Sequence, residues 1–124
     1  MWLGVLELST GKISYVNAGH KPPLVCNKDG LVYRLDAVSG PALGYRNAVY
    51  ANQEMVLQSG ERLFLYTEGF SDSVNASQEA FGLERLEQSV AHAQKPDAVM
   101  AAVKAYMDGA EQVHDMTYLW LERV

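Results

Sequence analysis

Cysteine, basic charge and long apolar runs are all scarce in this sequence. Its one cysteine, Cys26, cannot form a disulfide within the chain, so we expect a reducing, cytoplasmic setting rather than a secreted scaffold. Ten Lys and Arg residues are outnumbered by 15 Asp and Glu residues, and the resulting net charge of −5 argues against nucleic-acid binding. No run approaches the ~18 apolar residues of a transmembrane helix, and the N-terminus lacks a basic segment followed by an apolar one. We therefore expect no membrane segment.

The sequence does contain enough apolar material for one hydrophobic core. A chain of 124 residues buries roughly two-thirds of the surface that it exposes when unfolded. No linker, repeat or low-complexity segment divides the chain, so we predict a single domain over residues 1–124.

Short apolar runs separated by turn residues predict β-strands in the first half of the chain. Trp2–Leu8 and Ile13–Asn17 form a first predicted hairpin. Pro23–Asn27 and Leu31–Leu35 form a second, because Asp-Gly between apolar runs is a strong hairpin signal. The Gly- and Pro-rich stretch 39–44 predicts an ordered loop across one end of the sheet. Further strands are predicted at Tyr50–Leu57, Arg62–Thr67 and Met116–Leu121, and the second of these is apolar enough to be covered on both faces.

The apolar period changes after residue 68. Leu83, Leu86, Val90 and Ala93 recur at helical spacing and predict an amphipathic helix that packs on a sheet face. A second helix is predicted from near Pro96 to a stop at Gly109, with an apolar stripe of its own. Strands, two helices and a returning strand make an α+β pattern.

Two acidic residues lie where predicted strands begin or end. Glu68 directly follows one strand and Asp115 directly precedes another, and Gly69 lets the backbone turn so that Glu68 and Asp72 can point into a cleft. Oxygen-rich sites suit Mg²⁺ or Mn²⁺, and a neighbouring imidazole such as that of His114 shifts the preference towards Mn²⁺. From spacing alone, a carboxylate at a strand end is more often simply solvated. Two alternatives stay open for His114: an altered metal ligand, or a surface side chain at a turn.

The other two histidines and the cysteine have structural explanations. We expect a hydrogen-bonding role for His20, a small apolar role in a strand for Cys26, and a favourable position for His92 near a helix C-terminus. The large aromatic side chains are expected in the core.

Five segments occur in an order that is found in a known family. They are YVNAGHKPPL (15–24), SGPALG (39–44), LQSGERLFLYTEGFSDS (57–73), FGLERL (81–86) and HDMTYLWLER (114–123). Together they resemble the C-terminal part of the bacterial PPM-type (type 2C) metal-dependent Ser/Thr protein phosphatases, in the sporulation stage II protein E branch. The resemblance implies an antiparallel β-sandwich with flanking helices, here the C-terminal half of that fold. It also implies a binuclear Mn²⁺ or Mg²⁺ site and hydrolysis of phosphoserine or phosphothreonine.

The resemblance assigns Glu68, His114 and Asp115 to the metal site. Glu68 stands where the family motif Thr-Asp-Gly has its metal-binding Asp, while His114 and Asp115 stand at the motif Asp-Asp-x-Thr. Glu68 is one methylene longer than Asp, and His114 removes a negative charge, which weakens Mg²⁺ binding more than Mn²⁺ binding. The family's early aspartates and its Asp-x-x-Gly-His-Gly segment have no counterpart in this sequence, so we expect no turnover by the chain alone.

Three functions follow as hypotheses. The first is a share of a phosphatase in bacterial signal transduction, acting on a phosphoserine protein such as an anti-sigma-factor antagonist and controlled by an upstream sensory or receiver domain. The second is a degenerate phosphatase-like module that binds a phosphoprotein or partner kinase without hydrolysis. The third is a plain interaction domain. Because half of the family's sandwich lacks a counterpart here, we also expect exposed sheet surface and a homodimer.

Overall fold

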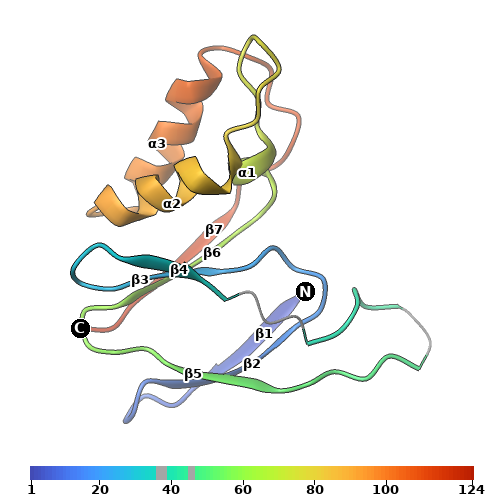
Figure 1. Cartoon of the computed structure of the whole chain (residues 1–124), viewed down its shortest axis with the longest axis vertical. Coiled ribbons are helices and arrows are strands. Elements are labelled where there is room, and N and C mark those ends of the chain that lie inside the picture. The colour runs from blue at the N-terminus through green and yellow to red at the C-terminus, as the bar shows by residue number, and fades with distance from the viewer. Residues whose placement is uncertain (36–38, 45–46) are drawn as a thin grey trace.

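The computed structural model describes residues 1–35, 39–44 and 47–124, and it confirms the α+β class (Figure 1). The elements of these ranges are β1 (Trp2–Leu6), β2 (Lys12–Asn17), β3 (Leu24–Cys26), β4 (Val32–Arg34), β5 (Gln53–Val56), β6 (Arg62–Tyr66), α1 (Gly69–Asp72), α2 (Gly82–His92), α3 (Pro96–Met107) and β7 (Tyr118–Glu122). No helix of the described ranges is long and apolar enough to cross a membrane.

The strands form two antiparallel sheets. One has the order β1-β2-β5 and the other the order β4-β3-β6-β7. Both predicted hairpins are confirmed, with β1 pairing with β2 and β3 pairing with β4. In the second sheet β6 pairs with β3 along one edge and with β7 along the other, so the ends of β6 and β7 lie side by side.

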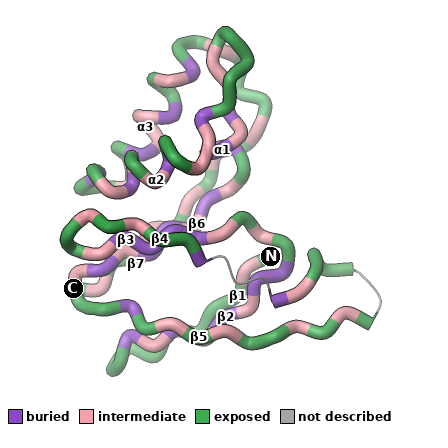
Figure 2. The backbone as a smooth tube through the Cα atoms, in the orientation of Figure 1, coloured by how far each residue is buried: buried purple, intermediate pink, exposed green. Residues whose placement is uncertain are grey.

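The four-stranded sheet is the middle one of three layers (Figure 1). Side chains alternate across a strand. Leu24 and Phe64 therefore face α2 and α3, while Val25 and Leu63 face the three-stranded sheet. These residues are at most 1% exposed, and Figure 2 shows the buried positions gathered along β3 and β6. The prediction that the 62–67 run is covered on both faces is confirmed.

Both predicted helices are present and bury their apolar stripes against the middle sheet. Pro96 occupies the first turn of α3, where its missing N–H costs nothing. The helix ends at Met107, and its C-cap residue Asp108, one residue before the predicted stop at Gly109, adopts the left-handed conformation with φ 48°. The 39–44 loop is ordered as predicted: Ser39 N–H donates to the Asn17 carbonyl at 3.0 Å, at the end of β2.

Several predicted boundaries were wrong by a few residues, and one element was not predicted. β1 stops at Leu6 because the turn begins at Glu7, whose carbonyl accepts a hydrogen bond from Gly11 N–H at 2.9 Å. Predicted strand Tyr50–Leu57 is shortened to β5, and predicted strand Met116–Leu121 is shifted to β7. The unpredicted helix α1 is separated from β6 by two residues and has only four residues.

Candidate functional site

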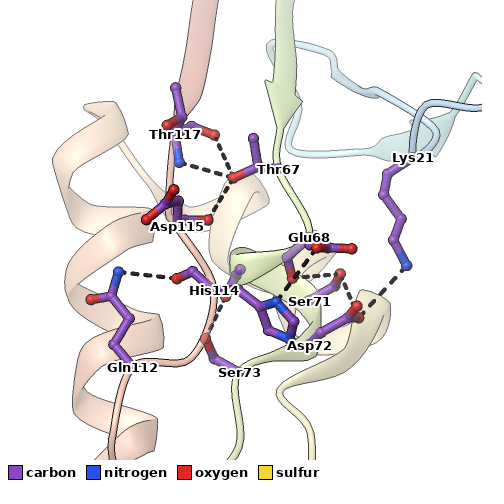
Figure 3. A network of polar contacts seen from close by, with 11 residues as sticks. Lys21, Thr67, Glu68, Ser71, Asp72, Ser73, Gln112, His114, Asp115 and Thr117 are labelled. Carbon is purple, nitrogen blue, oxygen red and sulfur yellow. Dashed lines mark hydrogen bonds and ion pairs between the residues drawn. The ribbon is translucent and has the colours of Figure 1, made fainter. Parts of the chain in front are cut away.

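Thr67 joins the residues that follow β6 to those that precede β7. Its N–H donates to the Thr117 carbonyl at 3.0 Å. Its hydroxyl donates to the Asp115 carbonyl at 2.9 Å and accepts a hydrogen bond from Thr117 N–H at 2.9 Å (Figure 3). The segment before β7 is thereby fixed next to the start of α1.

Gly69 allows these two segments to approach closely. A Cβ at this position would overlap the Asp115 carbonyl and would lie 2.8 Å from Met116 Cγ. The next residue, Phe70, is fully buried and anchors α1 in the core. Glycine is required here by the space between the two segments.

Glu68 and His114 meet at this junction. His114 Nδ1 lies 3.4 Å from Glu68 Oε1, with side-chain exposures of 38% and 58% (Figure 3). Positions 68 and 114, which the family resemblance assigns to one site, therefore lie side by side in the fold. The side chain of His114 is partly exposed and faces a carboxylate, and its role as an altered metal ligand stays a prediction.

Asp72 lies at the end of α1 and has other partners. Its Oδ1 is 3.6 Å from Lys21 Nζ and accepts a hydrogen bond from the Ser71 hydroxyl at 3.1 Å (Figure 3). Its N–H donates to the Glu68 carbonyl at 2.8 Å. Asp72 thus pairs with a cation from the loop after β2.

Asp115 contributes its backbone to the junction. Its carbonyl accepts the Thr67 hydrogen bond, whereas its exposed carboxylate points away from Glu68 in Figure 3. The structure therefore brings two of the three predicted ligands together, and the side chain of the third faces elsewhere.

The donor groups at this junction are the Glu68 carboxylate and the His114 imidazole. One carboxylate and one imidazole, both open to water, suit a single Mn²⁺ or Mg²⁺ whose other positions are filled by water. Within residues 1–35, 39–44 and 47–124, no group of three or more His, Cys, Asp or Glu side chains gathers to hold a metal. These residues by themselves do not fit a binuclear centre.

The structural explanations of the other marked residues agree with the geometry. His20 Nδ1–H donates to the Lys21 carbonyl at 2.6 Å, and His92 Nδ1–H donates to the Gln88 carbonyl at 2.7 Å in the last turn of α2. Cys26 is fully buried in β3, where its sulfur accepts a hydrogen bond from Arg62 at 2.9 Å.

Two residues of the site were not predicted from the sequence. Thr67 connects the ends of β6 and β7, and Lys21 pairs with Asp72. Lys21 could have been noticed in the sequence because it is the only Lys or Arg between positions 13 and 27. Thr67 could have been noticed because it lies between an apolar run and Glu68.

The family model for stage II sporulation protein E (SpoIIE) matches residues 1–124. The chain belongs to the SpoIIE family. The protein IcfG of Synechocystis sp. is 31% identical over 129 residues, which cover 99% of this chain and 20% of IcfG. The phosphoserine phosphatase RsbP of Bacillus subtilis is 31% identical over 67 residues, which cover 54% of this chain and 17% of RsbP.

A solved structure agrees with the SpoIIE assignment. The SiaA-PP2C domain of Pseudomonas aeruginosa superposes with a TM-score of 0.75 at 25% identity, covering 90% of this chain and 46% of that one. The architecture is therefore that of a PP2C-type phosphatase, as the sequence resemblance implied. The chain spans less than half the length of each of these relatives.

Proposed function

We propose that this chain is the C-terminal part of a metal-dependent phosphoserine or phosphothreonine protein phosphatase domain and has no turnover alone. The observation that carries the proposal is the 3.4 Å approach of His114 to Glu68. Both residues stand where the resembling family has metal-binding carboxylates, and they come from segments that only the folded sheet brings together. Two side chains that converge in this way are suited to hold one cation.

The relatives support a divalent cation. The phosphatase domain of SpoIIE from Bacillus subtilis, studied after presoaking with Mn, has the same fold, with a TM-score of 0.73 at 12% identity over 99% of this chain and 56% of that one. A bound Mn²⁺ or Mg²⁺ activates water and neutralises phosphate charge. In this chain Glu68 and His114 would hold the cation. We propose Asp115, which stands beside His114 in the same family motif, as a third ligand.

The proposed substrate is a phosphoserine or phosphothreonine protein of bacterial signalling, such as an anti-sigma-factor antagonist. RsbP, which carries the name phosphoserine phosphatase, supports this class. We propose a cytoplasmic protein whose activity is controlled by an upstream sensory or receiver domain.

We also propose that the 124-residue chain forms homodimers. Leu3, Val5 and Val56 are 59%, 70% and 44% exposed. Leu3 and Val5 alternate with the core-facing Trp2 and Leu6, so they lie on the outer face of the three-stranded sheet. Sedimentation as a monomer at high concentration would contradict the dimer.

A second candidate function is a degenerate module that binds a phosphoprotein without hydrolysing it. It is favoured by the two departures from aspartate at positions 68 and 114. It is also favoured because each of the two carboxylates, Glu68 and Asp72, already has a partner from this chain: His114 for the first and Lys21 for the second.

The two candidate functions can be distinguished in a protein that carries the rest of the domain. We expect Glu68→Asp with His114→Asp to raise Mn²⁺-dependent release of phosphate from a phosphopeptide if the site is a working but weakened one. Unchanged activity and Mn²⁺ affinity would favour the binding module. Release of phosphate by the 124-residue chain alone would contradict the proposal that it has no turnover.

A further inference from the structure

An open hollow lies beside Glu68, between the loop that follows β2 and the end of β6. Its volume is about 450 Å³, and its polar lining includes His20, Lys21, Thr67 and Glu68. The cationic residues of this lining are Lys21 and Met1, whose N-terminal ammonium donates to the Ala18 carbonyl at 2.7 Å. A hollow of this size is large enough for the side chain of a phosphorylated residue.

The backbone that carries Lys21 is held from several sides. Asn17, which is 2% exposed, accepts a hydrogen bond from His20 N–H at 2.8 Å and donates its amide to the His20 carbonyl at 3.2 Å. Gly19 has φ +73° and lies against Ala42, so a side chain at this position would be strained and crowded. The His20 ring then holds the Lys21 carbonyl at 2.6 Å. The Cα position of Lys21 is thereby fixed relative to the hollow.

The ammonium group of Lys21, in contrast, is loosely held. The side chain is 43% exposed, and its contact with Asp72 at 3.6 Å is long. An exposed ion pair of this kind contributes little to stability, because solvent screens it and both side chains lose rotational freedom. When Lys21 leaves, Asp72 retains the Ser71 hydroxyl at 3.1 Å, and Glu68 retains His114. Moving the Lys21 ammonium from Asp72 to another anion therefore costs little free energy.

We propose that Lys21 binds the phosphate of the phosphoserine or phosphothreonine ligand in this hollow, exchanging Asp72 for the phosphate oxygens. The inference rests on the proposed function, since it identifies the residue that recognises the phosphorylated side chain. An ammonium group is a compact charge with three donors, and its hydrogen bonds to phosphate are stronger than those between neutral groups.

The local charges make this binding depend strongly on Lys21. Glu68 and the nearby Asp72 contribute −2, while Lys21 and the N-terminal ammonium of Met1, which also lines the hollow, contribute +2 with the histidines neutral. Removing Lys21 leaves −1 facing a phosphate dianion. We therefore expect metal-free binding to be weak, sensitive to salt and specific for the phosphorylated form.

The test is an NMR titration of the 124-residue chain, in EDTA, with a phosphoserine peptide and with its unphosphorylated counterpart. We expect shifts at residues 19–21 and 67–68 with the phosphopeptide alone. Lys21→Gln should weaken its binding about tenfold, or about 1.4 kcal/mol, while Lys21→Arg should retain most of it. The matched control is Lys12→Gln, because Lys12 is equally exposed, at 43%, and pairs with Glu54 at 3.1 Å on the three-stranded sheet.

A parallel Mn²⁺ titration by calorimetry separates the inference from the proposed function. Equal phosphopeptide affinity of wild type and Lys21→Gln, or no preference for phosphate in a chain that binds Mn²⁺, overturns the role of Lys21 and leaves the proposed function intact. A chain that binds neither the phosphopeptide nor Mn²⁺ overturns both.

Discussion

The hydroxyl of Thr67 lies 2.9 Å from the carbonyl oxygen of Asp115 and ties the residues before β7 to those after β6. The two strands are paired from Arg62↔Glu122 to Tyr66↔Tyr118, and the Thr67 bonds extend this pairing past the end of the sheet. His114 is the neighbour of Asp115, so the same bond holds its imidazole opposite Glu68. The geometry of the candidate cation site therefore depends on a residue that is not itself a ligand.

Thr67→Val should loosen the contact between the residues that follow β6 and those that precede β7. Valine has nearly the same shape but can neither donate to Asp115 nor accept from Thr117, so we expect a loss of about 1–2 kcal/mol in the free energy of unfolding. Mn²⁺ affinity should fall as well, because His114 is no longer held opposite Glu68. Urea denaturation and calorimetry measure the two effects. Thr117→Val is the control, since Thr117 bonds Thr67 through its backbone; equal losses in the two variants would contradict this role.

Gly69→Ala should destabilise the fold although alanine favours helix. In a helix interior, alanine is favoured over glycine by about 1 kcal/mol. At this position, however, the added Cβ meets the Asp115 carbonyl and Met116. We expect a net loss of about 1–3 kcal/mol, as for other overpacked positions. A free energy of unfolding that is unchanged or higher in urea denaturation would show that the two segments are not in close contact in solution.

Tyr118→Phe should lower stability in a pH-dependent way. The Tyr118 hydroxyl donates to Asp97 Oδ1 at 2.8 Å. This bond, together with desolvation and the negative charge of Asp97, raises the pKa of Tyr118 above its ordinary value of 10.0. A raised pKa in the folded state means that the stabilisation is fully present below the unfolded pKa and is lost as pH rises through the folded pKa.

The measurement for Tyr118 is the difference in the free energy of unfolding between wild type and Tyr118→Phe. It should be constant from about pH 7 to 9 and shrink above about pH 10. A difference that grows with pH would mean that the hydrogen bond to Asp97 does not form.

The sequence predicted the parts of the site that depend on strand order. Glu68 directly follows one apolar run and His114 precedes another by one intervening residue, so their meeting follows once those runs pair as β6 and β7. The orientation of Asp115 was not predictable, because it depends on a hydrogen bond from Thr67. The contact of Lys21 with Asp72 needs both a loop fixed by Asn17 and a four-residue helix that is too short for a periodic apolar pattern.

The fold was predictable to a similar degree. The spacing of apolar residues along a strand or a helix indicates which of its faces are buried. The two covered faces of β6 and the core sides of α2 and α3 therefore follow from residue type. Strand ends are set by turn hydrogen bonds, such as that from Gly11 N–H to the Glu7 carbonyl, and these leave little mark on composition.

The central claim is that Glu68 and His114 bind the same divalent cation, and a double-mutant cycle on Mn²⁺ binding tests it most directly. Calorimetry on the 124-residue chain should show that Glu68→Gln and His114→Ala each weaken Mn²⁺ binding at least about tenfold. The double variant should lose little more than either single one, because one ion is involved. Glu54→Gln is the control, since Glu54 is exposed to a similar extent, at 55% against 58% for Glu68. Mn²⁺ affinity that is unchanged in both single variants, or losses that simply add, would contradict the shared site.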